Sequence, residues 1–379
     1  MSSAPVPRGD SDLHTGGSMA SNNVFSICAL PGDGIGVEVM APTIAVLQRA
    51  AARVGGFDLR FEEHRAGAFA YRDTGTALSD ATLDAARRAD AILLGAMGWP
   101  EIRYPDGTEI APQLDLRFAL ALYAGVRPIR ALPNLPSVLA DPRAAGIDFV
   151  LIRESTEGLF ASRGKGVVID DREARDTLVI TREVSERLFG FSFDLARSRR
   201  KQGRPGLVTC VDKANVFTSF AFFRRIFDEC AARNPDIAAE RAYVDATALY
   251  MLKRPWTFDV LVTENMFGDI LSDLAAGLCG GMGFAPSADV GDDHAVFQPC
   301  HGTAPDIAGQ GKANPIASML SGAMMLDWLG RRHNSEAAVR AGALIRDAVD
   351  AALTEGIRPF EVGGGDGTGA IARAVLDNL

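Results

Sequence analysis

The stretch Val24-Phe-Ser-Ile-Cys-Ala-Leu-Pro-Gly-Asp-Gly-Ile-Gly36 decides the fold class of this chain. Residues 24–30 form a short apolar run that predicts a buried strand. A glycine turn follows, and residues 36–55 carry the periodic apolar pattern of a helix. Because strands and helices alternate in the same way along the rest of the 379 residues, the sequence predicts an α/β protein.

The other elements are predicted from apolar runs and helical periodicity. Further strands are expected at 91–94, 149–152, 206–210, 242–244 and 260–263, and further helices at 79–88, 114–124, 214–234 and 337–356. No repeat or low-complexity linker divides the chain, so a second lobe would arise only where the chain crosses between lobes.

The turn Gly32-Asp-Gly-Ile-Gly36 lies between a strand and a helix, where a dinucleotide-binding motif would lie. It lacks the third glycine two residues further on, and no acidic residue ends a second strand at the right distance. The sequence therefore does not predict a classical Rossmann fold.

Composition excludes several classes of protein. A net charge of −9 argues against a nucleic-acid partner. We expect no membrane span, because no apolar run approaches the roughly 18 residues that one needs. Five scattered cysteines without a C-x-x-C motif indicate reduced thiols in a cytoplasm. Residues 1–23 lack an apolar segment and predict a disordered leader or tag, not a signal peptide.

Three carboxylates, Asp245, Asp269 and Asp273, are candidate metal ligands. Asp269 and Asp273 are four residues apart in Asn265-Met-Phe-Gly-Asp-Ile-Leu-Ser-Asp273, and in a helix this spacing places them on one face. Their neighbours are apolar, so unpaired carboxylates would be costly. The pattern favours a buried site for a hard divalent cation over a solvated acidic face.

Six motifs occur in order over residues 26 to 330: Leu30-Pro-Gly-Asp-Gly-Ile-Gly36, Leu94-Gly-Ala-Met-Gly98, Arg153-Glu-Ser-Thr-Glu-Gly158, Val211-Asp-Lys-Ala-Asn-Val216, the segment 265–273, and His301-Gly-Thr-Ala-Pro-Asp306 with Asn314-Pro315. Together they resemble the β-decarboxylating dehydrogenases, which include isopropylmalate, isocitrate, homoisocitrate, tartrate and D-malate dehydrogenases.

The resemblance implies a two-domain isopropylmalate dehydrogenase-like fold. A cofactor-binding domain would comprise residues 24–124 plus 280–379, and a domain for substrate, metal and dimerisation would comprise 125–279. An arm near 158–185 would pair with a second subunit. The implied assembly is a homodimer or a higher even oligomer.

The resemblance also implies a substrate site built from arginines. Arg117, Arg127 and Arg153 match the family's three arginines, and guanidinium groups suit a malate-type acid because each can bind a carboxylate with two hydrogen bonds. Lys213 matches the lysine that transfers a proton at the substrate hydroxyl, and Asp245 matches a ligand of Mg²⁺ or Mn²⁺ that also contacts this lysine. In the family both reach the site from the neighbouring subunit.

The cofactor site of the family lies on the loop that begins at His301. The matching residues here are His301, Gly302, Ala304, Asp306, Ile307 and Asn314, with Asn265 on the nicotinamide side. A carboxylate at Asp306 can accept both hydroxyls of an unmodified ribose and would repel a 2′-phosphate. Family members that use the phosphorylated cofactor have Lys-Tyr where this chain has Asp306-Ile307, so the expected cofactor is NAD.

One position departs from the family pattern. Phe160 stands where the family has a tyrosine that protonates the enol left by decarboxylation, and Phe160 has no hydroxyl to donate. Three outcomes are open: water or Lys213 protonates the enol, the enzyme stops at oxidation, or the chain is catalytically impaired. A regulatory subunit of a dehydrogenase is therefore an alternative to an active enzyme.

The substrate itself is left open among 3-isopropylmalate, D-malate and tartrate-like acids. Gln113 and Leu114 take two places that are both leucine in isopropylmalate dehydrogenases, and a buried, unpaired amide beside an isopropyl group would be costly. The stretch Gly95-Ala-Met-Gly-Trp-Pro100 resembles the tartrate and D-malate enzymes.

Overall fold

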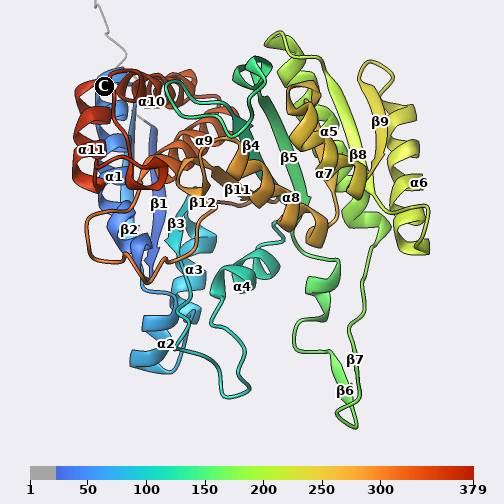
Figure 1. The fold of residues 1–379 in the computed structure, drawn as a ribbon. Helices are drawn as coiled ribbons and strands as arrows, with labels where there is room; N and C mark the ends of the chain where they lie inside the picture. The colour runs from blue at the N-terminus through green and yellow to red at the C-terminus, as the bar shows by residue number, and fades with distance from the viewer. Residues whose placement is uncertain (1–22) are drawn as a thin grey trace, which may run out of the picture.

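The computed structural model describes residues 23–379, so the predicted leader at 1–23 lies outside the described residues except for Asn23, which begins the first strand. A ten-stranded sheet runs through the whole molecule in the order β2-β1-β3-β12-β11-β4-β5-β10-β8-β9, and β6 and β7 form a separate hairpin. Figure 1 shows two lobes of helices and strands joined through the centre of this sheet, with the β6–β7 hairpin extending away from the body.

The strands are β1 (Asn23–Gly32), β2 (Phe57–Glu63), β3 (Ala91–Ala96), β4 (Ala124–Arg130), β5 (Asp148–Glu154), β6 (Val167–Ile169), β7 (Glu173–Arg175), β8 (Leu207–Asp212), β9 (Ala238–Tyr243), β10 (Val260–Thr263), β11 (Pro286–Val290) and β12 (Ala295–Pro299). The α-helices are α1 (Ile35–Val54), α2 (Ala68–Thr74), α3 (Asp80–Arg88), α4 (Pro112–Ala119), α5 (Arg182–Lys201), α6 (Thr218–Arg233), α7 (Val244–Lys253), α8 (Asn265–Leu278), α9 (Ile316–Arg332), α10 (Glu336–Thr354) and α11 (Thr368–Asp377). Short 3₁₀ helices include η2 (Leu159–Ser162) and η5 (Phe360–Val362).

The α/β prediction is confirmed, and so is the absence of a classical Rossmann fold. Strands at both ends of the sheet pair in parallel, but β11 is antiparallel to β12 and β4, and β4 is antiparallel to β5. The central strands therefore reverse direction between the two lobes. The chain reaches the second lobe through β4 and returns to the first at β11 and β12, as a crossing between lobes requires.

Three predicted boundaries are wrong. The helix expected at 114–124 ends at Ala119, because residues 124–130 form the central strand β4. The helix expected at 214–234 begins only at Thr218. The strand expected at 242–244 is β9, which ends at Tyr243, and Val244 already belongs to α7.

The glycine turn after β1 is a packing junction. Asp33 is fully buried, and its carboxylate accepts hydrogen bonds from the backbone N–H groups of Ala68 at 2.6 Å, Phe69 at 2.9 Å and Gly98 at 2.9 Å. Gly32 has a φ of +75°, and a Cβ there would meet the Ala96 carbonyl oxygen at 1.9 Å. The turn therefore needs glycine for conformation and close approach, and Asp33 ties β1 to the segments after β2 and β3.

Helix α1 corrects the expectation about apolar runs. It is 20 residues long with a mean hydropathy of 1.2, which meets the length and composition of a membrane span. Half of that apolar window is buried inside the fold, where α1 packs on β3, α9, α10 and α11. This burial identifies α1 as a core helix of the first lobe.

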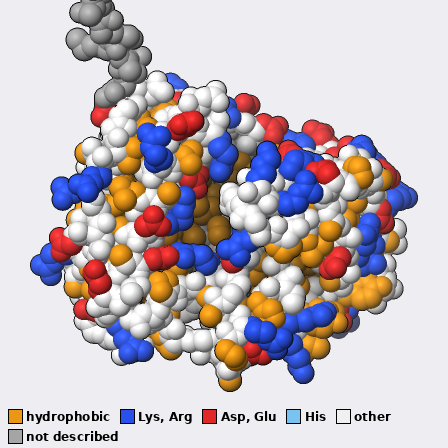
Figure 2. Space-filling model, turned by 90° about the horizontal axis from the view of Figure 1, so that it is seen from above, with side chains coloured by type: hydrophobic (Ala, Val, Ile, Leu, Met, Phe, Trp, Pro, Cys, Tyr) orange, Lys and Arg blue, Asp and Glu red, His pale blue; other side chains and the backbone are white. Residues whose placement is uncertain are grey.

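The two faces of the central strands are covered by different helices. Helix α8 packs on β4, β5 and β10, whereas α9 packs on β11, β12 and β3, and α5 packs on β5, β8 and β10. Seen from above, the molecule is hollowed between its lobes, with hydrophobic side chains inside the hollow and basic side chains near its margin (Figure 2). Because side chains alternate between the faces of a strand, the central strands present one set of residues to each face.

Candidate active site

A small polar cavity of about 170 Å³ lies where α4 and α8 meet the ends of the central strands. The three arginines expected to bind substrate, Arg117, Arg127 and Arg153, all line it. They come from α4, β4 and β5, and each is at least nine-tenths buried. The structure thus brings together three residues that are far apart in the sequence.

A buried carboxylate that the sequence analysis missed pairs with two of these arginines. Asp289, on β11, is 1% exposed. It accepts a hydrogen bond from Nε of Arg117 at 3.1 Å and lies 3.6 Å from the Arg127 guanidinium. Burial alone would raise the pKa of Asp289, but Arg117 and Arg127 hold it below its ordinary value. A lone aspartate in the apolar strand Ala288-Asp-Val290 was the available signal, because a buried charge needs a partner.

One guanidinium nitrogen in the cavity remains unsatisfied. The Nη1 atom of Arg127 is buried and has no hydrogen-bond partner within residues 23–379. Leaving a buried donor unpaired is costly, and a bound carboxylate oxygen would satisfy it. This orphaned donor marks the position at which an anion would be held.

Arg153 is fixed by residues at the start of α8. Its Nε donates to the Asn265 side-chain oxygen at 2.9 Å, and its Nη1 pairs with Asp269. Asn265 is fully buried and donates through its amide nitrogen to the Glu157 carbonyl oxygen at 3.0 Å. Burial and the neighbouring Arg117 lower the pKa of Arg153 to about 10. Asn265 therefore positions Arg153, and it is not among the residues that line the cavity.

The predicted helix that carries the two carboxylates is α8. Asp269 and Asp273 both line the cavity from one helical face, as their spacing predicts. Burial and the nearby Asp269 raise the pKa of Asp273, since two like charges resist ionising together. The site is not deeply buried as the apolar neighbours suggested, because Ile270 is 61% exposed and the side chain of Asp269 is 46% exposed.

Lys213 and Asp245 form a pair at a separate place. Lys213 Nζ donates to the Asp245 carboxylate at 2.6 Å, and this hydrogen bond lowers the pKa of Asp245. Neither residue lines the cavity that holds Asp269 and Asp273. Within residues 23–379, no three His, Cys, Asp or Glu side chains gather closely enough to hold a metal ion. A single copy of the chain thus supplies two carboxylates to the cavity and holds the third apart.

Phe160 lies in η2, next to Arg153. Its ring centroid is 5.0 Å from the guanidinium carbon of Arg153, which is cation–π distance. The position therefore faces Arg153. The two neighbours that could have replaced a tyrosine hydroxyl are engaged elsewhere: Ser162 donates to the Thr177 carbonyl oxygen, and Arg163 pairs with Asp115 on α4 at 2.9 Å.

The expected cofactor residues divide into two groups. His301 and Gly302 line the cavity, and the buried Nε2 of His301 has no partner within residues 23–379. Burial lowers the pKa of His301, which favours the neutral imidazole. Farther along the loop, Asp306 is exposed, Ala304 has a φ of +39° and Ile307 is partly buried.

Two acidic residues to which the sequence assigned no role hold the loop that begins at His301 by hydrogen bonds. Glu38 on α1 accepts hydrogen bonds from the backbone N–H groups of Gly309 and Ala313, each at 3.1 Å. Asn314 donates to Glu361 at 3.3 Å and accepts from the N–H of Ile316 at 3.2 Å. Asn314 thus has a structural role at the start of α9.

Gln113 and Leu114 lie on α4 and face different spaces. Gln113 lines the arginine cavity, and its buried Oε1 accepts no hydrogen bond within the described part of the chain. Leu114 lines a more open hollow together with Phe160 and Met266. An unpaired amide oxygen beside the arginines fits a ligand that carries a hydroxyl group better than a purely apolar one.

Comparisons with known proteins show the family of this chain. The family model for isocitrate/isopropylmalate dehydrogenase matches residues 26–375. The chain belongs to this family. A 3-isopropylmalate/3-methylmalate dehydrogenase of Methanocaldococcus jannaschii is 41% identical over 357 residues, which cover 94% of this chain and 99% of that protein. A 3-isopropylmalate dehydrogenase of Anaeromyxobacter dehalogenans is 41% identical over 361 residues, covering 93% of this chain and 99% of that protein.

Solved structures give the same result. The crystal structure of isocitrate dehydrogenase from Methylococcus capsulatus matches with a TM-score of 0.82 and 36% identity, over 93% of this chain and 99% of that chain. The apo form of a β-decarboxylating dehydrogenase from Thermococcus kodakarensis matches with a TM-score of 0.76 and 36% identity, over 93% and 96%. The family resemblance and the two-domain dehydrogenase fold are thereby confirmed, and the chain is a decarboxylating dehydrogenase that acts on a CH–OH group.

Removing the buried charge of Asp289 should destabilise the protein strongly. Asp289→Asn leaves Arg117 and Arg127 without their counter-ion, and breaking a buried pair costs about 3–5 kcal/mol. Asp84→Asn is the matched control, since the side chains of Asp84 and its partner Arg87 are both exposed and exposed pairs contribute at most about 1 kcal/mol. Urea unfolding at pH 7 measures both, and equal midpoints for the two variants would contradict this account.

The same measurement has a pH dependence with a defined sign. Since the pKa of Asp289 is lower in the folded state than in the unfolded state, its stabilisation is present above the unfolded pKa, about 3.9. It is lost as the pH falls through the folded value. The stability difference between wild type and Asp289→Asn should therefore be full at pH 7 and shrink below about pH 4.

Proposed function

We propose that this protein oxidises and decarboxylates a malate-type 2-hydroxy acid with NAD and Mg²⁺ or Mn²⁺. The observation that carries the proposal is the cavity in which three buried arginines face two carboxylates on α8. Arg117, Arg127 and Arg153 suit the carboxylates of such an acid. The unpaired Nη1 of Arg127 is a donor that a substrate carboxylate would satisfy.

The charges around the cavity support a dicarboxylate that binds together with a divalent cation. The three guanidinium groups are balanced by three carboxylates, those of Asp269, Asp273 and Asp289. A dianionic acid alone would leave the cavity negative, and a divalent cation alone would leave it positive. Bound together, they leave its net charge unchanged, which avoids the cost of an uncompensated buried charge.

The donor set fits a hard cation. Asp269 and Asp273 offer only oxygen atoms, and their mutual repulsion would be relieved by bound Mg²⁺ or Mn²⁺. Asp245 of a second copy would be the third ligand. When bound, such an ion polarises the substrate's C2 oxygen and stabilises negative charge as CO₂ leaves.

A homodimer or a higher even oligomer would complete the site. The exposed apolar residues Leu249 and Leu252 lie on α7, the helix that carries Asp245, and Ile270 lies on α8. Val167 and Val168 on the arm are also exposed, at 51% and 71%. Apolar surface of this kind marks interfaces. Pairing of these surfaces would carry Lys213 and Asp245 into the cavity of the second copy.

Within that assembly each residue has a defined task. Lys213, as the neutral amine, would accept the proton of the substrate hydroxyl, and NAD would supply the hydride acceptor. Arg153, held by Asn265, would orient the carboxylates. His301, whose pKa burial lowers, has a ring nitrogen without a partner among the described residues and would contact the cofactor, with Asp306 on the ribose of the cofactor. Residues 24–124 plus 280–379 would form the cofactor domain and 125–279 the substrate domain, and the enzyme would work in the cytoplasm.

Gln113 favours a substrate with a hydroxyl group, or with no substituent, at C3 over a substrate with an isopropyl group there. Its unpaired Oε1 would accept a hydrogen bond from a tartrate-like acid, whereas beside an isopropyl group it would stay unsatisfied. The relatives are named for 3-isopropylmalate, so Gln113 would mark a difference in specificity within the family. The alternative function, an impaired or regulatory subunit, rests on Phe160 alone.

Activity should require the metal and Asp269. The purified protein, given NAD, Mn²⁺ and a panel of malate, tartrate and isopropylmalate, should form NADH and CO₂ in equal amounts, and EDTA should stop both. Asp269→Asn should lower turnover by at least about 10³-fold. Full turnover in EDTA would contradict the metal site. If no acid yields NADH or CO₂, the regulatory alternative is favoured.

A shared site predicts complementation between two inactive variants. Lys213→Ala and Arg153→Ala proteins are each expected to be inactive. After subunit exchange, a mixed dimer has one site with both defects and one with neither. Activity should return to about a quarter of wild type in an equimolar mixture, because half of the dimers are mixed and each has one intact site. No recovery after exchange is demonstrated by mass would contradict the shared site.

Phe160→Tyr tests the position opposite Arg153. The added phenol would supply a proton donor for the enol, and general acid catalysis is typically worth ~10²–10⁴-fold. Decarboxylation of the supplied 2-keto acid should therefore rise at least about 10-fold, and single-turnover hydride transfer should change less. Phe217→Tyr, at an exposed position, is the control. If CO₂ release is unchanged, another group already protonates the enol.

A further inference from the structure

A second and larger cavity lies on the opposite face of the central strands. Its volume is about 490 Å³, within the range of small-molecule sites. Its apolar floor comes from β4, β5, β11 and β12 through Val126, Pro128, Val150, Ala288, Val290 and Phe297. Along the same strands, Arg127, Arg153, Ser287 and Gln298 face the arginine cavity. The two cavities thus lie back to back and share no lining residue.

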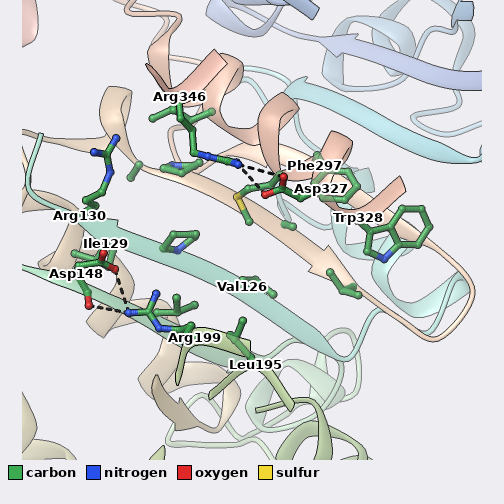
Figure 3. Close-up of a pocket in the computed structure, with 18 of the residues that line it drawn as sticks. Val126, Ile129, Arg130, Asp148, Leu195, Arg199, Phe297, Asp327, Trp328 and Arg346 are labelled. Carbon is green, nitrogen blue, oxygen red and sulfur yellow. Dashed lines mark hydrogen bonds and ion pairs between the residues drawn. The ribbon is translucent and has the colours of Figure 1, made fainter. Parts of the chain in front are cut away.

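The walls of this back cavity come from both lobes. Phe191 and Leu195 on α5 form one side, and Met324 and Trp328 on α9 form the other. Figure 3 shows Leu195 and Trp328 on either side of the strand that carries Val126 and Ile129. Apolar surface left between two helices favours an apolar occupant, because water there makes few hydrogen bonds.

Among residues 23–379, one cation at the polar margin of the back cavity has no counter-ion. Three arginines at the margin are neutralised: Arg130 by Asp350 at 2.7 Å, Arg199 by Asp259 at 2.6 Å, and Arg346 by Asp327 at 2.9 Å. Figure 3 shows the Arg346–Asp327 pair, and it also shows the contact of Arg199 with a second carboxylate, that of Asp148, at 3.1 Å. Arg331, an exposed residue in the last turn of α9, has no carboxylate within ion-pair distance in the described part of the chain.

We propose that the back cavity binds an aliphatic monocarboxylate, with its chain on the apolar floor and its carboxylate at Arg331. A longer polyanion has no match, since the other arginines are already paired. An uncharged aliphatic molecule would fill the floor and leave Arg331 unused. A medium-chain carboxylate satisfies both features, because a charge-assisted hydrogen bond to a guanidinium is the strong kind.

Decanoate, below its micelle-forming concentration, is the probe, and calorimetry with the full-length protein is the measurement. Wild type should bind one equivalent saturably. Arg331→Gln should weaken binding about 10-fold, and 1-decanol should bind about as weakly as decanoate binds to that variant. Arg340→Gln removes the same charge from an exposed position on α10 and should leave the affinity unchanged.

Two filling variants, each with a tryptophan that occupies space in the back cavity, test the proposal independently of Arg331. Met324→Trp and Leu195→Trp project from opposite walls, and either one, if its thermal midpoint shows that it folds, should abolish binding. Arg153→Ala should bind decanoate as wild type does, which separates the back cavity from the arginine cavity. Non-saturable uptake, undiminished binding to a folded filling variant, or loss of binding in Arg153→Ala would each overturn the proposal.

Discussion

The site depends on one buried ionic contact, that of Asp289 with Arg117 and Arg127. These three residues come from β11, α4 and β4, so the contact joins segments that the chain visits long apart, at the point where the sheet reverses direction. A single aspartate cannot neutralise two guanidinium groups, and Arg153 adds a third. Asp269 and Asp273 on the facing helix balance the remaining positive charge, so a dianionic acid would bind there together with a divalent cation.

The alternation of side chains along the central strands gives the molecule two different faces. On β4, Arg127 faces the polar cavity, whereas Val126 and Pro128 face the apolar one. On β11 the same alternation separates Ser287 from Ala288. A strand has only one layer of backbone between its faces. Both cavities border both lobes.

The fold and the reactive side chains could be predicted from the sequence more completely than the residues that surround those side chains. The family motifs and the four-residue spacing predicted that Asp269 and Asp273 lie on one helix. The three predicted arginines lie together in one cavity. Asp289 was missed because its partners are about 170 positions away, and a lone aspartate in a strand has no local pattern. The boundary at 114–124 was misplaced because the apolar residues 120–123 follow α4 directly and continue its pattern up to β4. The contact between Phe160 and Arg153 likewise could not be predicted without the structure.

The most direct test of the account is a crystal structure with Mn²⁺ and a malate-type acid, using the anomalous signal of manganese to locate the ion. The account predicts one peak at about 2.0–2.6 Å from carboxylate oxygens of Asp269 and Asp273. Asp245 of a second copy should be the third protein ligand, and the carboxylates of the acid should lie on Arg117, Arg127 and Arg153. A manganese ion held by other residues, or an acid bound away from the three arginines, would contradict it.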